Sequence, residues 1–472
     1  MNSLLLKLYH RLPPVARSAA ATLHGLYLRS WRYGPDYERL VAEALEREQW
    51  SAARWSRWRE ERLAYVLHRA ATRVPFYREQ WNARRRAGDH SSWEVLENWP
   101  ILHKEPLRFE PRAFLADDCH PRRMLHEFTS GTTGKAIELW KGRAAVQMLY
   151  ALAAVRIRRW HGVTRGDRYA IIGGQLVAPV AQRRPPFWVW NAALKQLYMS
   201  SYHLAPDLIP HYLDALARYH VRFVFGYTSS LYALALEALR GGWPRLRMAV
   251  AITNAEPVDD HERTTIGAAF ACSVRESYGM SENAAAASEC EHGRLHLWPE
   301  LGHIEVFEDT APVPPGVVGD LVCTGLLNAD MPLIRYRLGD RGALAATDAT
   351  CFCGRTLPLL ATVEGRSDDV LYTSDGRRIG RLDPVFKAGL AIREAQIVQE
   401  HLDQVRVRYV PVAGFGPAHG QSIVERLQAR MGPLRVVLEP VSEVPRTANG
   451  KFRAVVCALP PEERETVLRA GR

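Results

Sequence analysis

Short apolar runs alternate with stretches of helical periodicity between about residue 145 and residue 275. The apolar runs, rich in β-branched and aromatic residues, are 169–172, 221–225 and 248–252. The helical stretches beside them are 144–160, 208–219 and 230–239. Such alternation is typical of βαβ units, so we expect the central part of the chain to form a mostly parallel sheet covered by helices.

The flanking regions differ from this central part. Residues 36–85 carry Trp55, Trp58, Arg62 and Tyr65 at spacings of three and four, which predicts helix. The VPFY sequence at 74–77 is expected to end that helix. After about residue 300, strands are predicted at 303–307, 319–324 and 333–336, which indicates a β-rich portion.

The chain is long enough for two domains. At 472 residues it exceeds the length over which one hydrophobic core keeps growing, and the polar sequence GRSDD at 365–369 marks a break. We therefore predict an α/β fold, with a large domain over residues 1–364 and a small α+β domain over residues 365–472.

Composition excludes several classes of protein. A chain with 47% hydrophobic and 24% charged residues resembles an ordinary globular enzyme rather than a disordered or fibrous protein. The formal charge of +11 favours anionic ligands. No basic run is interleaved with aromatic residues and no zinc-finger spacing occurs, so we expect no nucleic-acid partner.

The N-terminal sequence leaves two interpretations open. Residues 1–9 read MNSLLLKLY, which is too short and too charged for a signal peptide, and no run of about 18 apolar residues occurs. We expect no transmembrane segment and a cytoplasmic protein. The stretch through Trp31 either packs on its own domain or makes weak peripheral contact with a membrane. The seven cysteines are an odd number, and without a secretory signal we expect no disulfides.

The sequence FTSGTTGKAIEL at 128–139 combines glycines, hydroxyl residues and one lysine. Backbone N–H groups, hydroxyl groups and a lysine in such a loop can surround phosphate oxygens. The loop matches neither the Walker pattern nor GxGxxG. On this pattern alone it is either a phosphate loop of another design or a surface turn.

Four further polar sequences follow in order. They are SYGMSE at 277–282, YRLGD at 336–340, GRSDD at 365–369 and PRTANGKFR at 445–453. The second is expected to place Asp340 at a strand end. Each alone is typical of a turn. Together and in this order, with the first loop, they resemble the adenylate-forming superfamily, which includes acyl-CoA synthetases, luciferases and the adenylation domains of nonribosomal peptide synthetases.

Other segments narrow the resemblance to one branch. VPFY at 74–77, WPILHK at 99–104, RIRRWHGVTRGD at 156–167 and CFCGR at 351–355 resemble the phenylacetate-CoA ligase-like branch, and within it the CapK-like group named for capsular polysaccharide biosynthesis. The resemblance covers nearly the whole chain, and it indicates the branch better than the substrate.

The resemblance implies an ATP-dependent ligase. Such enzymes join a small carboxylic acid to AMP and then pass the acyl group to coenzyme A, to a carrier thiol or to an amine. Residues 370–386 depart from the apolar and glycine-rich pattern of the coenzyme A ligases, which weakens that assignment. The alternative is a non-catalytic or degenerate nucleotide-binding protein in a polysaccharide or secondary-metabolite pathway.

The resemblance also implies roles for single residues. The residues expected to hold the phosphates are Thr129, Ser130, Gly131, Thr132, Thr133, Gly134 and Lys135. Tyr278, followed by Gly279, would lie on the adenine, Ser281 would touch the α-phosphate, and Glu282 would bind Mg²⁺. Asp340 would bind the ribose, with Arg366 nearby. Lys451 would be the catalytic lysine of adenylation, with Glu282 and Arg366 as further catalytic residues. Asp368 would be the hinge, although it could also cap a local turn.

Two further sites are predicted. The acyl pocket is expected near the strand ends at Gly173, Tyr227, Asn254, Ala255 and Glu256, although Tyr227 could equally be a core aromatic residue.

Thiol and imidazole groups recur in the β-rich portion. Cys290, His296, Cys351 and Cys353 offer the four sulfur and nitrogen ligands of a structural zinc site, with His292 in reserve. The resemblance adds support, because such a cluster recurs in the branch. The alternative is a pair of reduced cysteines in a turn beside a histidine on a strand.

Overall fold

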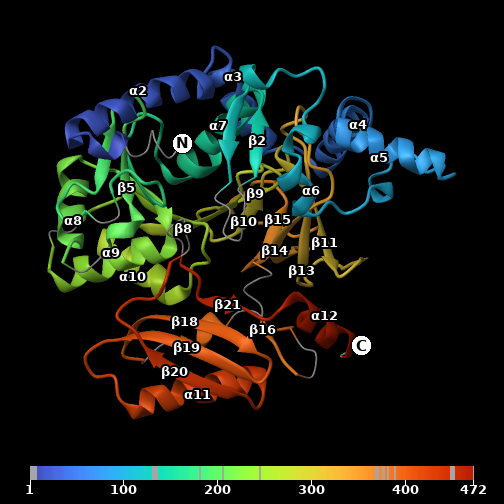
Figure 1. The fold of residues 1–472 in the computed structure, drawn as a ribbon. Helices are drawn as coiled ribbons and strands as arrows, with labels where there is room; N and C mark the ends of the chain where they lie inside the picture. Colours follow the sequence, from blue (N-terminus) through green and yellow to red (C-terminus); the bar gives the residue numbers. More distant parts are fainter. Residues whose placement is uncertain are drawn as a thin grey trace. The chain divides into compact units, whose positions relative to one another are not determined.

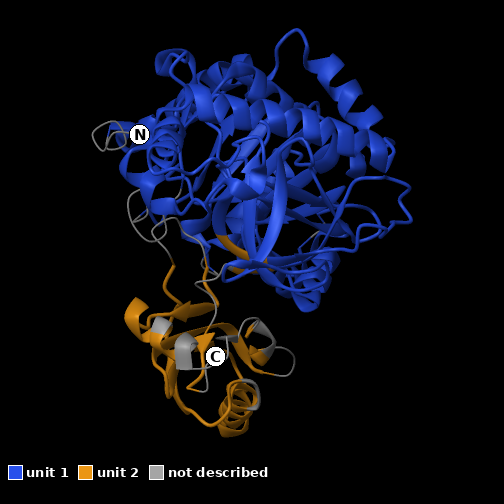
Figure 2. Cartoon of the chain, turned by 90° about the vertical axis from the view of Figure 1, so that its right-hand side faces the viewer, with its two compact units in different colours: residues 1–338, 342–363 blue, residues 339–341, 364–472 orange. Residues whose placement is uncertain are grey.

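The protein is described by a computed structural model that covers residues 8–129, 137–179, 182–204, 207–243, 246–366, 371–374, 378–379, 382–386, 390–446 and 452–470. Contacts divide the chain into two compact units, drawn in separate colours in Figure 2. The larger unit comprises residues 1–338 and 342–363, and the smaller comprises residues 339–341 and 364–472. That residues 1–364 form the AMP-binding domain and residues 365–472 the small domain with the catalytic lysine stays a prediction.

The larger unit contains the N-terminal helices and the helices of the βαβ region (Figure 1). Its α-helices are α2 (Pro14–Arg32), α3 (Tyr37–Arg47), α4 (Ala52–Arg73), α5 (Pro75–Arg86), α6 (Lys104–Phe109), α7 (Arg143–Ala153), α8 (Ile209–Arg218), α9 (Thr228–Arg240) and α10 (Asp260–Phe270). Capping residues mark the first turn of two of these helices. Ser51 accepts a hydrogen bond from Arg54 N at the start of α4, and Asp259 and Glu262 form a capping box at the start of α10.

The strands of the larger unit form one extended sheet and a hairpin. The hairpin pairs β1 (Leu125–Phe128) with β2 (Glu138–Lys141). The sheet strands are β3 (Tyr169–Gly173), β4 (Trp188–Asn191), β5 (Gln196–Ser200), β6 (Phe223–Tyr227), β7 (Val250–Asn254), β8 (Ser273–Gly279), β9 (Ala286–Glu289), β10 (Leu295–Leu297), β11 (Gly302–Glu308), β12 (Ala311–Pro312), β13 (Gly319–Gly325), β14 (Tyr336–Leu344) and β15 (Leu359–Arg366). Their order is β12-β11-β13-β14-β15-β10-β9-β8-β7-β6-β3-β5-β4.

The parallel part of this sheet follows the prediction. Strands β5, β3, β6, β7 and β8 pair in parallel, and helices α8, α9 and α10 connect β5 to β6, β6 to β7 and β7 to β8. The strands from β9 onward continue the same sheet with antiparallel pairs such as β8–β9 and β11–β13. The predicted α/β class is therefore confirmed, and the β-rich portion extends the sheet rather than standing apart from it.

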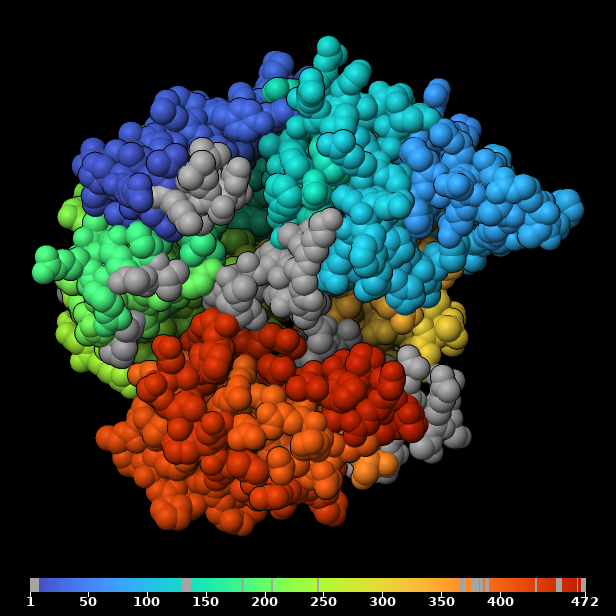
Figure 3. Space-filling model, in the orientation of Figure 1, coloured from blue at the N-terminus to red at the C-terminus, as the bar shows by residue number. Residues whose placement is uncertain are grey.

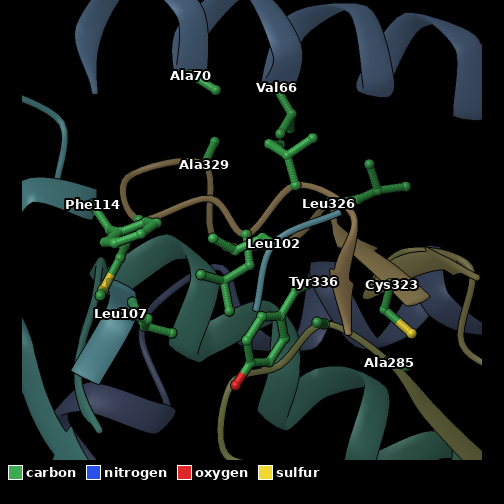
Figure 4. Close-up of a cluster of buried hydrophobic side chains, with 14 of the residues drawn as sticks. Val66, Ala70, Leu102, Leu107, Phe114, Ala285, Cys323, Leu326, Ala329 and Tyr336 are labelled. Atoms are coloured by element: carbon green, nitrogen blue, oxygen red, sulfur yellow. The ribbon is translucent and has the colours of Figure 1, made fainter. Parts of the chain in front are cut away.

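The main core lies where α4 and α5 pack beside the strands of the β-rich portion (Figure 4). Val66, Ala70, Phe114 and Tyr336 are fully buried there. The large apolar area that such residues remove from water is the main stabilising term of the unit. A separate core beneath β3, β5, β6 and β7 is formed with α8, α9 and α10.

The predicted end of the helix at VPFY is confirmed, and two other local predictions were wrong. Helix α4 ends at Arg73, as expected, but Pro75 opens a new helix, α5, since proline fits the first turn of a helix. Residues 333–335 are not in a strand, because Arg335 has φ +46, which strand pairing does not allow. Strand β14 begins at Tyr336, and Asp340 lies inside this strand rather than at its end.

The smaller unit has its own core and its own sheet. The sheet order is β20-β19-β18-β21, with β18 (Ile392–His401), β19 (Gln404–Pro411), β20 (Arg435–Pro440) and β21 (Val455–Cys457). The described part of this unit also contains helices α11 (Pro417–Met431) and α12 (Pro461–Ala470), the short 3-10 helix η8 (Asp383–Phe386), and the hairpin of β16 (Leu371–Tyr372) and β17 (Arg378–Ile379). Its buried residues include Leu371, Ile397, Val405 and Ile423.

Candidate functional site

The carboxyl ends of four neighbouring parallel strands bring polar residues to one edge of the sheet. These residues, called the carboxyl edge, are Gly173 of β3, Tyr227 of β6, Asn254 of β7 and Tyr278 of β8. Tyr227 is paired in register with Asn254, and Asn254 with Ser277. In open α/β sheets, ligands bind at the carboxyl ends of the strands. The edge therefore joins the predicted acyl pocket to the predicted adenine site.

The turn after β8 carries the predicted magnesium ligand. Tyr278 and Gly279 end the strand, and the chain turns where Asn283 N donates to Met280 O (3.1 Å) with Asn283 at φ +55. Ser281 is exposed in this turn. Glu282 is half-buried, and the Tyr336 hydroxyl donates to its Oε1 (3.2 Å). Tyr336 is fully buried, so its ring gives the carboxylate a rigid support.

Strands β1 and β2 lie on either side of the glycine-rich loop, and β2 is hydrogen-bonded to the turn after β8. Thr129 N donates to Ile137 O (2.9 Å), and Ile137 N donates to Thr129 Oγ1 (3.0 Å), which closes the stem of the loop. Lys141, at the end of β2, is buried beside Glu127. In the orientation that satisfies its amide, Asn283 accepts from Lys141 Nζ (3.1 Å) and donates to Met280 O (3.2 Å). The loop stem and the Tyr278–Glu282 turn are thus held together.

Eight of the predicted residues lie outside the described residues: Ser130, Gly131, Thr132, Thr133, Gly134, Lys135, Asp368 and Lys451. Arg366 is the last residue of β15, and Asp340 lies in β14. The contact pattern groups both with the smaller unit. Their predicted roles stay predictions.

The acyl side of the carboxyl edge contains an unsatisfied polar atom and a strained residue. Asn254 Oδ1 is buried and accepts no hydrogen bond from the described residues. Buried acceptor atoms nearly always accept a hydrogen bond, so the Asn254 oxygen suits a ligand that donates a hydrogen bond to it. The next residue, Ala255, has φ +63, a conformation that costs a non-glycine residue about 1–2 kcal/mol.

Glu256, also predicted to line this pocket, has a structural role. Its Oε2 accepts from Ser229 N (2.8 Å), and its backbone oxygen accepts from the Thr228 hydroxyl (3.1 Å). The carboxylate therefore caps the first turn of α9, where a negative charge is favourable.

Tyrosines surround the end of β3. A Cβ on Gly173 would lie 2.7 Å from the hydroxyl oxygen of Tyr198, so a larger residue at position 173 would displace this tyrosine side chain. The Tyr202 hydroxyl donates to Gly174 O (3.1 Å). Burial raises the pKa of Tyr198 and of Tyr227, which keeps both phenols protonated as hydrogen-bond donors. The predicted acyl pocket is therefore bordered at the end of β3 by aromatic rings that carry hydroxyl groups.

Sequence reasoning missed four residues of this arrangement. They are Lys141, Tyr198, Tyr202 and Asn283. None belongs to a motif that carries chemistry, and their contacts span many residues of sequence. Tyr336 stands in the YRLGD sequence, but its bond to Glu282 has no signal in the sequence.

The predicted metal ligands meet in space. The ligand atoms of Cys290, His296, Cys351 and Cys353 lie within 4.8 Å of one another. Sγ of Cys290 is 3.6 Å from Sγ of Cys351, and Sγ of Cys353 is 3.3 Å from Nε2 of His296. A tetrahedral zinc ion with bonds of about 2.0–2.3 Å would require ligand separations of about 3.5–3.8 Å. His292, the reserve ligand, is not part of this group.

The surroundings of this Cys–His cluster suit a metal. His296 Nδ1 is 3.3 Å from Leu357 O, so the other ring nitrogen faces the cysteines. Burial lowers the pKa of His296 to about 4, which keeps the imidazole neutral, the form that binds a metal. All seven cysteines are free thiols in the structure.

A buried ion-pair cluster lies beside the Cys–His cluster and comprises Glu48, Arg156, Glu300 and Arg355. Arg156, fully buried in a π-helical turn (Ala154–Arg158), donates to both oxygens of Glu300 at 2.8 and 2.9 Å. Arg355 lies two residues after Cys353, bonds Glu48 (3.3 Å) and stacks on Trp160 at 4.3 Å. These contacts fasten the cysteine loop to the end of α3.

Comparisons with known proteins give matches over nearly all of the chain. The family described as AMP-binding enzyme matches residues 53–330, more than half of the chain, and the family described as CapK C-terminal domain matches residues 371–458. Protein CapK of Staphylococcus aureus is 24% identical over 463 residues, covering 95% of this chain and 98% of that protein. Phenylacetate-coenzyme A ligase of Thermus thermophilus is 26% identical over 470 residues, covering 90% and 99%.

Solved structures show the same fold. A 2-hydroxyisobutyryl-CoA ligase in its postadenylation state, in complex with R3-HIB-AMP, has a TM-score of 0.66 at 21% identity and covers 98% of this chain and 96% of its own. An open conformation of that ligase in complex with 2-HIB-AMP and CoA has a TM-score of 0.54 at 22% identity and covers 87% and 93%.

Proposed function

The chain belongs to the AMP-binding enzyme family, the adenylate-forming superfamily, in its phenylacetate-CoA ligase-like and CapK-like branch, and from this we propose that it is an ATP-dependent carboxylate ligase. The proposed enzyme makes an acyl-adenylate and transfers the acyl group to coenzyme A or to another thiol or amine. The observation that supports it most is the shared carboxyl edge, where Tyr227, Asn254 and Tyr278 stand on neighbouring parallel strands.

In the first proposed half-reaction, a carboxylate oxygen bonds to the α-phosphorus of ATP, and the bond from that phosphorus to the β-phosphate oxygen breaks. Pyrophosphate leaves with the electron pair. Two anions must approach each other, so positioning and charge neutralisation provide most of the rate. We assign the neutralisation to Lys135 and Lys451, and the placing of the adenine to Tyr278.

Glu282 is the proposed ligand of Mg²⁺, which would neutralise phosphate charge when it is bound. Glu282 Oε2 is the carboxylate oxygen that would bind the cation. Tyr336 donates to Oε1, and among the described residues no group donates to Oε2. A carboxylate oxygen is the ligand that this hard cation prefers. Asp340 and Arg366 keep their proposed roles at the ribose.

In the second proposed half-reaction, a sulfur or nitrogen nucleophile attacks the acyl carbon, and AMP leaves with the electrons of the broken C–O bond. Coenzyme A is the first acceptor to test, because related ligases carry it in their names. The acid itself is expected to be small and to offer a hydrogen-bond donor, such as a hydroxyl group, to Asn254 Oδ1.

The test is carboxylate-dependent exchange of labelled pyrophosphate into ATP, measured over a panel of aryl, fatty, hydroxy and amino acids. We expect at least one acid to support exchange and Lys451→Ala to abolish it while ATP still binds. Lys195→Ala is the matched control, since Lys195 is an exposed lysine that donates to Gly166 O (2.8 Å) and lies outside the proposed site. Equal exchange by Lys451→Ala and the wild type would contradict the proposal. No exchange with any acid would favour a non-catalytic nucleotide-binding protein.

We also propose that the Cys–His cluster holds a structural zinc ion. A metal there would join the β9–β10 turn to the cysteine loop at 351–353. Metal analysis of the purified protein should give about one zinc per chain, and Cys353→Ser should lose it. Cys272→Ser, at a half-buried cysteine outside the cluster, should keep it. Zinc content that does not change in Cys353→Ser would contradict this assignment.

A further inference from the structure

Helix α2 carries small and apolar residues on two opposite faces. One face packs on strand β4. Trp190 N donates to Ser18 Oγ (3.2 Å), and Ala192 N donates to Thr22 Oγ1 (3.1 Å). A Cβ on Gly25 would lie 2.1 Å from Asn191 Oδ1, so glycine is needed for this close approach. The expectation that the N-terminal stretch packs on its own domain is thus met by one face only.

The opposite face is an exposed apolar stripe. Val15, Leu23, Leu26 and Tyr27 have exposed fractions of 83%, 68%, 53% and 49%. Ala19 stands between Val15 and Leu23 at helical spacing and is exposed as well. Leu8 and Leu12 continue the exposed apolar residues before Pro13. Of the fourteen exposed large apolar side chains among the described residues, six lie between Leu8 and Tyr27.

This concentration is unusual for the surface of a globular protein. Single exposed apolar residues need no explanation, but a row of them on one helix face marks a contact surface. Helix α2 lies at the outside of the larger unit in Figure 1, and its atoms form part of the dark blue surface in Figure 3. No helix among the described residues is long and apolar enough to cross a bilayer.

The charge of the same segment indicates the partner. The first 35 residues contain five basic residues, Lys7, Arg11, Arg17, Arg29 and Arg32, and neither aspartate nor glutamate. Arg17 is turned inward, where it donates to Val177 O (3.3 Å). Arg11 and Arg29 are exposed. An apolar stripe with basic residues beside it and no acidic ones is the chemistry of a helix that lies in an anionic lipid surface.

We propose that the exposed stripe formed by Leu8, Leu12, Val15, Ala19, Leu23, Leu26 and Tyr27 docks on an anionic bilayer surface. The apolar side chains enter the boundary between headgroups and acyl chains, and Arg11 and Arg29 contact lipid phosphates. A second copy of the chain is a poorer occupant. A two-fold contact places the same surface against itself, and the first 35 residues, with basic but no acidic side chains, would bring like charges together.

The experiment is co-sedimentation of the full chain with vesicles of phosphatidylcholine alone or mixed with phosphatidylglycerol. We expect binding to the anionic vesicles, weaker binding at high salt, and little binding to the neutral ones. The double variant Leu23→Glu/Leu26→Glu should lower the partition constant about tenfold or more, since both side chains lose their apolar burial. Leu239→Glu and Val317→Glu, with exposed fractions of 49% and 45% on other surfaces, should bind as the wild type does.

A second variant separates charge from apolar contact. Arg11→Gln/Arg29→Gln keeps the stripe and should lose most of the preference for anionic vesicles. The proposal is overturned if the wild type does not sediment, if both vesicle types bind equally, or if the control variants lose binding as well. It is also overturned if Leu23→Glu/Leu26→Glu abolishes a dimer in gel filtration while vesicle binding is absent, because the stripe would then belong to a second copy.

Discussion

At the carboxyl edge, buried Asn254 Oδ1 has no hydrogen-bond partner among the described residues and Ala255 has φ +63. In the buried ion-pair cluster, Arg156 is paired twice with Glu300, and Glu48 contacts both Trp160 and Arg355. The first region leaves polar atoms open to a ligand and carries backbone strain. The second pairs its charges and fastens distant segments; its one buried atom without a hydrogen bond among these four residues, Arg156 Nε, still lies 3.8 Å from the Glu48 carboxylate. Unsatisfied groups and strain are typical of binding sites, whereas paired networks are typical of structural supports.

The comparison predicts that changes in the two regions have opposite signatures. Variants at the carboxyl edge should lose activity and keep stability. Variants in the ion-pair cluster should lose stability and keep the activity of each folded molecule.

The largest effect is expected for Arg156→Met. It leaves the Glu300 carboxylate buried without its partner, which should lower the free energy of unfolding by about 3–5 kcal/mol. Denaturant unfolding measures this value. The double variant Arg156→Met/Glu300→Met removes both charges and should recover most of the loss. If Arg156→Met has the same free energy of unfolding as the wild type, the Arg156–Glu300 pair does not stabilise the fold.

Glu282→Gln should have the next largest effect. Removal of the proposed cation ligand should lower pyrophosphate exchange about 10²-fold, the typical result of losing one preorganised electrostatic contact. The free energy of unfolding should change by no more than about 0.5 kcal/mol. Glu94→Gln, at an exposed carboxylate elsewhere, serves as the control. A lower free energy of unfolding with unchanged pyrophosphate exchange would show that Glu282 stabilises the fold rather than binding the cation.

Tyr336→Phe tests whether the support of Glu282 matters. The loss of one hydrogen bond to a carboxylate, worth about 1.5 kcal/mol, should lower exchange about tenfold. Raised Mg²⁺ should restore part of the rate if the hydroxyl positions the cation ligand. An equal rate loss at every Mg²⁺ concentration would contradict that role.

The smallest effect is expected for Ala255→Gly. Glycine adopts φ +63 without strain, so the folded state should gain about 1–2 kcal/mol. The greater freedom of the unfolded chain should offset about 0.5–1 kcal/mol of this gain. Thermal unfolding measures the balance. A destabilised variant would show that Ala255 is held by packing rather than under strain.

The sequence could predict what depends on local pattern. The βαβ alternation predicted the parallel strands. The strand ends predicted for the acyl pocket, with Gly173, Tyr227 and Asn254, lie at the carboxyl edge beside Tyr278 of the SYGMSE sequence. The Cys–His spacing likewise named four ligands that meet in space. In each case the residue types themselves carry the chemistry.

The remainder depends on contacts between distant segments. The Tyr336–Glu282 bond and the Lys141–Asn283 bond each join two loops, and no periodicity marks them. The strand expected at 333–336 failed because one residue, Arg335, takes a left-handed conformation that its buried hydrogen bonds to Trp99 O and Glu305 hold in place. Tertiary context overrode local preference there.

Amide hydrogen exchange with and without ATP and Mg²⁺ tests the central claim most directly. The account predicts slower exchange in peptides that cover residues 223–231, 250–257 and 276–284, at the ends of β6, β7 and β8. Peptides that cover the Cys–His cluster, at 288–298 and 351–357, should exchange at unchanged rates. Slower exchange around the Cys–His cluster with none at the strand ends would contradict the account.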